Sequence, residues 1–145
     1  MNLFNDSSVD IIICMEVLEH VKNPFNASKE IQRVLKPNGI LIASTVFIYP
    51  LHEIPNDFYR FTRYGVDESF KDMKKIDLQA RNRYFLSIYS LLLRLGMNNR
   101  KRIIISSLII FPFLLILTPF FLIMNILFDT EYSTTGYYFI FKKIK

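Results

Sequence analysis

The segment 9–45 constrains the fold of this chain more than any other part of its sequence. It begins and ends with short apolar runs, Val9–Met15 and Ile40–Thr45, which are rich in β-branched residues and predict two buried strands. The first run is so uniformly apolar that we expect a central strand buried on both faces. The stretch between the runs, Asn23–Lys36, has apolar residues at helical spacing. The segment therefore predicts a βαβ unit with parallel strands, and hence an α/β fold.

Local signals mark both ends of the predicted helix. Asn23 is a favourable N-cap, and Pro24 stands at the first helical position, where a missing N–H costs nothing. At the other end, Pro37 disfavours helical geometry at Lys36, and the Asn-Gly pair after it tolerates positive φ. We therefore expect the helix to end at Lys36 and a tight turn to lead into the second strand.

Polar residues follow each of the two strands. In an open parallel sheet, ligands bind beyond the carboxyl ends of the strands. Glu16, Glu19 and His20 follow the first strand, and the polar, aromatic loop 50–64 follows the second. We expect these two segments to line one crevice. For Glu19, the alternative is that its carboxylate only opens a helix, where the helix dipole favours it.

Weaker patterns predict the remaining elements. Residues 66–73 indicate a short helix and residues 76–80 a further strand. Residues 84–95 indicate an apolar helix that ends at Gly96. The aromatic run Tyr137–Lys142, after a turn-like Ser-Thr-Thr-Gly, predicts a last strand.

The most hydrophobic part of the chain is Ile103–Phe128, which has 26 residues and no charge. A helix of that length is about 39 Å long, against a hydrocarbon core of about 30 Å, so a single tilted span fits. Pro112 and Pro119 argue for a broken, re-entrant hairpin instead. If the strand 137–142 joins the same sheet, the chain must return to the side it left, which also favours the hairpin.

The net charge is +5, and positively charged side chains cluster near this hydrophobic block, around residues 94–102 and 142–145. This distribution suits a cytoplasmic membrane surface better than a nucleic acid, which calls for a basic face or stripe. The alternative for the last lysines is a solvated basic rim. The single cysteine, Cys14, rules out an intrachain disulfide framework, so we expect a reducing, cytoplasmic compartment for the α/β part.

The segment 9–45 resembles the second half of a class I S-adenosylmethionine-dependent methyltransferase. The likeness lies in Asp10 at the strand start, in the sequence EVLEHV at Glu16–Val21, and in E-I-x-R-V-L-K-P-x-G at Glu30–Gly39. It covers roughly residues 3–75 and the last strand. The loop 49–65 resembles a subgroup with membrane-inserting C-terminal segments. One departure is Asn38, where the family usually has glycine.

The resemblance implies a partial Rossmann-like sheet that binds S-adenosylmethionine. The Gly-rich cofactor loop and the ribose-binding acid of the family precede the part that this chain matches. The four glycines here, at positions 39, 65, 96 and 136, are too scattered to form such a loop. We therefore expect the chain to be a C-terminal portion, truncated and inactive by itself, that needs a complementing N-terminal half.

The resemblance also implies roles for residues at the two loops. Those bordering the cofactor are Met15, Glu16, Glu19 and His20. In the loop after the second strand, His52 is the candidate base and Asp57 would orient it, while Tyr59 and Arg60 would bind the acceptor substrate. The alternative is a loop held by its own Asp–Arg and His–backbone bonds. Two histidines 32 positions apart (52 − 20) and a distant cysteine predict no metal site.

These expectations combine into one division of the chain and two hypotheses for its function. The division is a partial methyltransferase-like α/β domain at 1–98, a membrane-embedding segment at 99–130 and a returning C-terminal strand at 131–145. The first hypothesis is methyl transfer from S-adenosylmethionine to a membrane-proximal small-molecule or lipid-linked acceptor, such as a lipid-linked saccharide. The alternative is a non-catalytic, membrane-associated remnant or interaction module.

Overall fold

The computed structural model describes residues 3–94, 104, 108, 110–128, 130 and 132–145. It divides into two compact units. The sheet unit comprises Met1–Phe47, Leu51–Gln79 and Gly136–Lys145. The helical unit comprises Ile48–Pro50 and Ala80–Thr135. The predicted boundaries between residues 98 and 99 and between residues 130 and 131 touch positions outside the described residues, as does the predicted helix end at Gly96.

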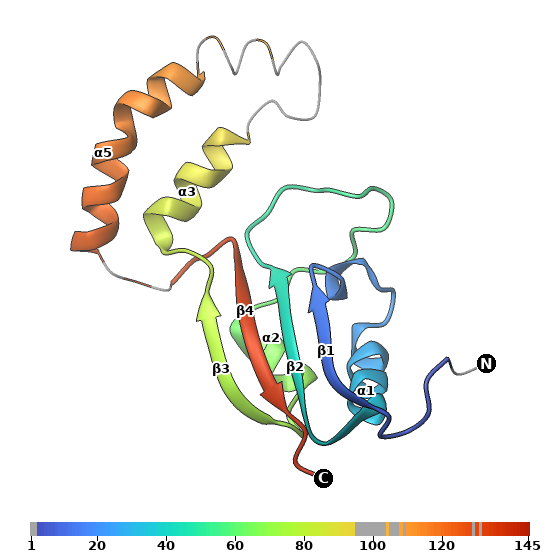
Figure 1. Cartoon of the computed structure of the whole chain (residues 1–145). Helices are drawn as coiled ribbons and strands as arrows, with labels where there is room; N and C mark the ends of the chain where they lie inside the picture. The colour runs from blue at the N-terminus through green and yellow to red at the C-terminus, as the bar shows by residue number, and fades with distance from the viewer. Residues whose placement is uncertain (1–2, 95–103, 105–107, 109, 129, 131) are drawn as a thin grey trace. The chain divides into compact units, whose positions relative to one another are not determined.

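The sheet unit is built on one four-stranded mixed sheet with the order β1-β2-β4-β3 (Figure 1). Its strands are β1 (Val9–Met15), β2 (Leu35–Val46), β3 (Lys74–Ala80) and β4 (Gly136–Lys142). β1 and β2 are parallel, which confirms the predicted βαβ unit, and β4 runs antiparallel to β2. The predicted last strand therefore belongs to the same sheet as the first two.

Helix α1 (Pro24–Val34) connects β1 and β2 and begins where the sequence predicts. The side chain of Asn23 accepts a hydrogen bond from the backbone N–H of Asn26 at 3.0 Å. The helix ends two residues before the predicted Lys36, because Leu35 already has extended geometry and pairs with β1. Asn38 adopts a left-handed φ of 67°. A Cβ at Gly39 would lie 2.8 Å from the carbonyl oxygen of Lys36, so glycine is required there.

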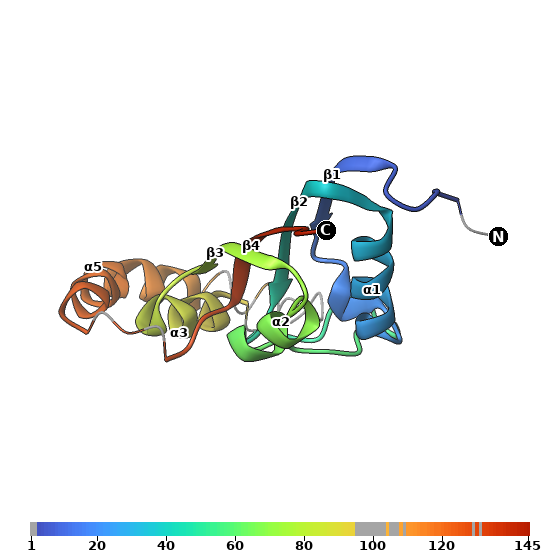
Figure 2. The same cartoon turned by 90° about the horizontal axis from the view of Figure 1, so that it is seen from below.

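Helices α1 and α2 (Arg63–Ser69) lie on the same face of the sheet (Figure 2). α2 starts three residues before the predicted position because the Thr62 side chain caps it by accepting from Gly65 N at 3.1 Å. Phe70, just after α2, packs against Phe139 and Phe141 of β4, with ring centroids 5.8 and 5.3 Å apart. The apolar core thus lies between this face and the two helices.

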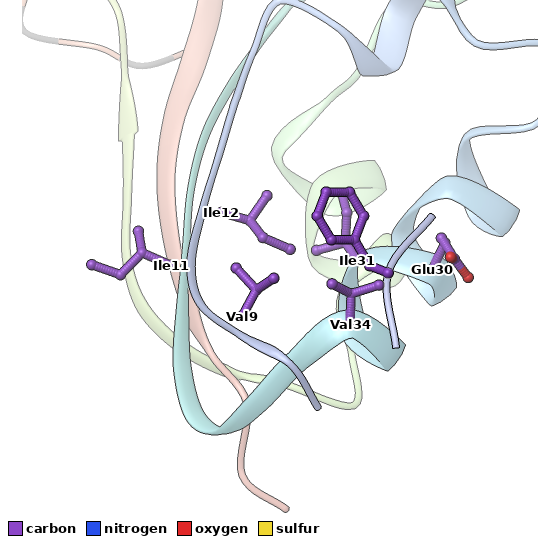
Figure 3. A pocket seen from close by; sticks show the side chains of 7 residues that line it. Val9, Ile11, Ile12, Glu30, Ile31 and Val34 are labelled. Atoms are coloured by element: carbon purple, nitrogen blue, oxygen red, sulfur yellow. The ribbon is translucent and has the colours of Figure 1, made fainter. Parts of the chain in front are cut away.

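The opposite face and the β1 edge are open, which corrects the prediction that β1 is buried on both faces. Ile11 and Ile13 are 55% and 70% exposed. A long apolar run predicts double burial only if helices cover both faces, and the exposure of Ile11 and Ile13 shows that this face of β1 is not covered. On the helix-facing side, Val9 and Ile12 of β1 face Ile31 across an apolar pocket (Figure 3).

In the helical unit, α3 (Tyr84–Leu93) packs beside α5 (Phe111–Leu127). α5 starts one residue before Pro112 and continues through Pro119, so neither proline breaks the helix that the structure describes. The Asn82 side chain accepts from Ser87 Oγ and Thr135 N, both at 2.9 Å. Within the described part of the chain, no helix combines the length and the apolar character that crossing a membrane requires.

Candidate functional site

The site begins where β1 ends, at the carboxyl edge of the parallel strand pair. Glu16, the residue after β1, has a left-handed φ of 53°, which is uncommon for a residue with a side chain. Its backbone N–H donates to the carbonyl oxygen of Ser44 at 3.1 Å, and the Ser44 hydroxyl donates to Glu16 Oε1 at 2.6 Å. These bonds hold the Glu16 carboxylate beside the end of β2. The short 3₁₀ helix η1 (Leu18–His20) follows.

The polar loop, residues 51–62, is tied by its backbone to both strand ends. The N–H of Phe61 donates to the carbonyl oxygen of Val46 at 2.9 Å, so the loop closes on the end of β2. The N–H groups of Phe58 and Tyr59 donate to the carbonyl oxygen of Glu19 at 2.9 and 3.2 Å. The segments after the two strands therefore meet, as the parallel pairing predicts.

Asp57 is the centre of a buried ionic cluster in the polar loop. Its side chain is 2% exposed, and its two carboxylate oxygens accept from the Arg60 guanidinium at 2.6 and 2.7 Å. Asp57 Oδ2 also accepts from His52 N at 3.0 Å and lies 3.3 Å from His52 Nδ1. The hydrogen bonds from Arg60 hold the pKa of Asp57 well below its usual range. Asp57 is therefore an ionised anchor that orients the His52 ring.

Glu19 is the most deeply buried acidic residue of the site. Its relative exposure is 0%. Oε2 accepts from the Thr45 hydroxyl at 3.0 Å, whereas Oε1 has no hydrogen-bond partner among the residues that the structure describes. Burial raises the pKa of Glu19, since a low-dielectric surrounding disfavours the charged carboxylate. The Oε1 atom is thus a buried acceptor that the described chain does not satisfy.

The two histidines meet next to this carboxylate. The rings of His20 and His52 form an edge-to-face pair with centroids 4.7 Å apart. His20 Nδ1 lies 2.7 Å from the backbone carbonyl oxygen of Asn56. A carbonyl oxygen only accepts, so His20 Nδ1 carries the proton and Nε2 keeps the lone pair of the neutral ring. The Tyr59 hydroxyl donates to the carbonyl oxygen of Lys22 at 3.0 Å.

Glu19, His20 and His52 form a cluster with the donor set of a metal site. One carboxylate oxygen and one nitrogen from each ring lie within 4.8 Å of one another. The spacing of the histidines in the sequence predicts no metal site, because it does not show that the polar loop folds back onto η1.

The structure gathers the predicted site residues at this one edge of the sheet. At the end of β1 these are Met15, the last residue of the strand, and Glu16, Glu19 and His20 after it; those in the polar loop are His52, Asp57, Tyr59 and Arg60. Of the bonds in the structural alternative, the Asp57–Arg60 pair is present; His52 contacts Asp57 through its backbone N–H and its ring, and the loop carbonyl of Asn56 is instead contacted by the His20 ring. The catalytic, cofactor and substrate roles stay predictions. Sequence reasoning missed Ser44 and Thr45, whose signal is a pair of hydroxyl residues that closes an otherwise apolar strand.

Comparisons with known proteins agree with this architecture. The family model described as "Methyltransferase domain" matches residues 1–43. A ubiquinone biosynthesis O-methyltransferase of Histophilus somni is 49% identical over 37 residues, which are 26% of this chain and 16% of that protein. An uncharacterized methyltransferase of Mycobacterium tuberculosis is 33% identical over 90 residues, which are 60% of this chain and 34% of that protein. The chain thus spans well under half the length of these curated relatives.

A solved structure extends the likeness to nearly the whole fold. Phosphoethanolamine N-methyltransferase 2 of Haemonchus contortus, in complex with S-adenosyl-L-methionine, aligns with a TM-score of 0.53 and 16% identity over 98% of this chain and 35% of that chain. At this identity the match concerns the fold alone. Together, the family model and the relatives make part of this chain similar to methyltransferases, and the fold is an α/β, Rossmann-like methyltransferase fold with a mixed sheet.

Proposed function

We propose that this chain takes part in methyl transfer from S-adenosylmethionine to an acceptor at a membrane surface. The observation that carries the proposal is the meeting of two polar segments, after β1 and after β2, at the carboxyl edge of a parallel strand pair in a methyltransferase-like sheet. The family match covers the first of these segments, since it ends at residue 43.

The residues at the end of β1 fit one side of the cofactor. Met15 is 45% exposed, and the neighbouring Glu16 carboxylate is fixed by Ser44, so an apolar and an anionic group lie side by side at the strand end. We assign cofactor contacts to these two residues. The four glycines of the sequence stand too far apart to cradle the rest of the molecule. When bound, S-adenosylmethionine supplies an electrophilic methyl group.

The polar loop supplies the groups for the acceptor. An oxygen or nitrogen nucleophile loses a proton as it gains the methyl group, and a base within hydrogen-bond reach assists that loss. Asp57 Oδ2 lies 3.3 Å from His52 Nδ1, which favours a proton on Nδ1 and leaves Nε2 as the accepting nitrogen. Arg60 is bound to both oxygens of Asp57, so its part in acceptor binding is to hold this ion pair in place.

The membrane part of the proposal rests on α5. Its exposed residues are nearly all large and apolar, including Phe113, Ile116 and Ile126 at 61%, 77% and 77% exposure. An apolar surface of this kind calls for an apolar partner, and a lipid interface beside a basic chain is one. We infer that α5 lies in the interface of the cytoplasmic leaflet and that the acceptor is lipid-linked, for example a lipid-linked saccharide.

The exposed edge of β1 has a place in the same proposal. Ile11, Ile13 and Met15 are 55%, 70% and 45% exposed along a strand whose outer side has no strand partner among the described residues. Exposed apolar edges invite further strand pairing. We propose that this edge receives a complementing strand from the cofactor-binding half of a methyltransferase.

The experiment uses the polypeptide as its own cells make it. The gene is tagged at its C-terminus, the protein is captured with whatever accompanies it, and transfer of a labelled methyl group from S-adenosylmethionine to a total lipid extract is measured. We expect label in a lipid fraction, a loss with His52→Ala, and about tenfold weaker binding of S-adenosylhomocysteine with Glu16→Gln, since a charged hydrogen-bonding group is lost. Glu53→Gln, an exposed acid in the same loop, is the control.

Two results would oppose this proposal. If the captured protein neither binds S-adenosylhomocysteine nor transfers label, the enzyme hypothesis fails and the non-catalytic, membrane-associated module becomes the better account. If label reaches only water-soluble acceptors, the methyltransferase stands but its lipid-linked acceptor does not.

A further inference from the structure

The buried Glu19 carboxylate lowers the stability of the fold unless something outside the described chain binds it. The side chain is fully buried, and Oε1 lacks a hydrogen-bond partner among the described residues. Leaving a buried carboxylate oxygen unsatisfied costs stability, so buried charges are normally paired or bound to metal ions. The groups next to Glu19 are two imidazole rings, which are common metal ligands.

In each of the two histidines, the ring nitrogen Nδ1 already has the kind of partner that is usual for a metal-bound histidine. In metal sites, a ligating histidine usually donates its other ring N–H to a carbonyl or carboxylate, which fixes the ring and its tautomer. Here Nδ1 of His20 donates to the Asn56 carbonyl, and Nδ1 of His52 lies 3.3 Å from the Asp57 carboxylate. Both rings thus keep Nε2 as the lone-pair nitrogen.

We propose that Glu19, His20 and His52 bind a divalent transition-metal ion that fastens the polar loop to the end of β1. A carboxylate with two imidazoles is a donor set that suits Zn²⁺ and its first-row neighbours better than Mg²⁺ or Ca²⁺, which prefer oxygen ligands. The carboxylate and one imidazole come from η1, and the other imidazole comes from the polar loop, so the ion would join His20 to His52, 32 positions apart (52 − 20).

The distances leave a small adjustment for binding. Zn²⁺ bonds of 2.0–2.1 Å in a tetrahedral site place neighbouring ligand atoms about 3.3 Å apart. One possible ligand atom from each of the three residues now lies within 4.8 Å of the other two, so binding requires side-chain rotations that draw the donors together. Three protein ligands also leave a fourth position open, which a water or an acceptor oxygen takes.

This inference stands apart from the proposed function. It concerns the affinity of three side chains for an ion, which is measured without cofactor or acceptor. While the ion is bound, His52 cannot act as the base, because a coordinated Nε2 accepts no proton, so the base role belongs to the ion-free protein. If the protein binds S-adenosylhomocysteine but no Zn²⁺, the methyltransferase proposal stands and the metal site is refuted. If it binds Zn²⁺ but no S-adenosylhomocysteine, the metal site stands and the methyltransferase proposal is refuted.

The test is calorimetric titration of Zn²⁺ into the tag-free 145-residue chain after treatment with a chelator. We expect one equivalent to bind and to raise the unfolding temperature. Glu19→Gln keeps the shape of the side chain and should weaken the affinity by roughly 100-fold or more, the upper range found for residues that only support ligands. The matched control is Glu53→Gln, which changes an exposed acid near His52 and should leave the affinity unchanged.

Nuclear magnetic resonance of the imidazole nitrogens gives a second readout. We expect Zn²⁺ to shift Nε2 of both histidines and leave both Nδ1 atoms protonated. The proposal is overturned if the chain binds no Zn²⁺, if Glu19→Gln binds it equally well, or if the shifts fall on the Nδ1 atoms. Should Glu19→Gln fail to fold, His20→Gln, at a partly exposed position, takes its place and must lose the same affinity.

Discussion

The sheet unit and the helical unit differ in how their helices begin. α1 and α2 start at side-chain caps, from Asn23 and Thr62. The N-cap residues of α3 and α5, Arg83 and Ile110, make no side-chain cap hydrogen bond. A cap fixes the residue at which a helix begins, because it satisfies N–H groups that have no partner inside the helix. Side-chain caps therefore fix where the helices of the sheet unit begin, whereas no such cap fixes the described starts of α3 and α5.

The two units also differ in where they place apolar and polar side chains. The sheet unit buries the aromatic side chains Phe70, Phe139 and Phe141. Its polar loop is held by hydrogen bonds and ion pairs around Asp57. The helical unit exposes much of the apolar surface of α5, whose uncovered residues include Phe111, Phe113, Leu115, Ile116, Phe120, Leu122, Ile123, Ile126 and Leu127. The first pattern specifies one arrangement of side chains. The exposed apolar side chains of α5 favour an apolar environment but do not specify whether lipid or protein provides it.

The largest effect is expected in the polar loop. Asp57→Asn removes the charge that Arg60 and His52 N–H share, and leaves a partly buried guanidinium without its counter-charge. We expect a loss of about 3 kcal/mol in the free energy of unfolding, the lower end for breaking a buried pair, because Arg60 is still 25% exposed. Urea unfolding of the full chain, followed by circular dichroism, measures it.

The control for Asp57→Asn is a pair with the same spacing on the surface. Glu68 and Lys71 are also three residues apart, and their side chains are 62% and 64% exposed. Glu68→Gln should leave the unfolding curve unchanged within error, because exposed ion pairs add little. Equal losses for the two variants would mean that the burial of the loop does not set its stability.

A smaller effect tests the surface of α5. Ile116→Asp puts a charge on its exposed side, and if α5 lies in a lipid interface this should weaken binding to anionic vesicles by about 2 kcal/mol, or roughly 30-fold. The measurement is co-flotation of the full chain with vesicles of phosphatidylglycerol and phosphatidylethanolamine. Leu51→Asp alters an equally apolar residue of the sheet unit at 73% exposure, against 77% for Ile116, and should bind as the natural chain does. Similar losses for both variants would remove the special role of α5.

Elements with local signals could be predicted closely from the sequence. The bounds of β1 agree because a β-branched run is flanked by polar residues, and the start of α1 agrees because Asn23 and Pro24 are position-specific. The left-handed φ of Asn38 follows from the tolerance of asparagine for that region. The last strand was recognisable from its aromatic run, although its place beside β2 depends on contacts across the whole chain.

Which side chains are buried and which contacts they make was harder to predict from the sequence than whether a segment is a helix or a strand. An apolar strand looks the same in sequence whether one or both faces are covered, so the exposure of Ile13 could not be read from β1 itself. The start of α2 was missed because Thr62 gives a weak cap signal inside a loop rich in polar residues. Such errors arise where tertiary context decides between equally suitable local choices.

The position of the candidate site could be predicted, but its internal contacts could not. The rule for parallel strands places Glu16 and the polar loop at one edge. It does not say that the loop turns back so that His52 meets His20, because that path depends on backbone bonds from Phe58 and Tyr59 to Glu19. The three-residue cluster is therefore visible only in the folded chain.

The smallest effect is expected at the N-cap of α1, since side-chain caps distinguish the helices of the sheet unit from those of the helical unit. Asn23→Ala removes the side-chain acceptor for Asn26 N at the start of α1 and should cost about 1 kcal/mol in the free energy of unfolding. Asn26→Ala, three residues further along the same exposed helix face, is the matched control and should be neutral or slightly stabilising, because alanine is the better helix former. Urea unfolding reports both. If Asn23→Ala has no effect, packing alone fixes the start of α1, and the contrast between capped and uncapped helices loses its energetic meaning.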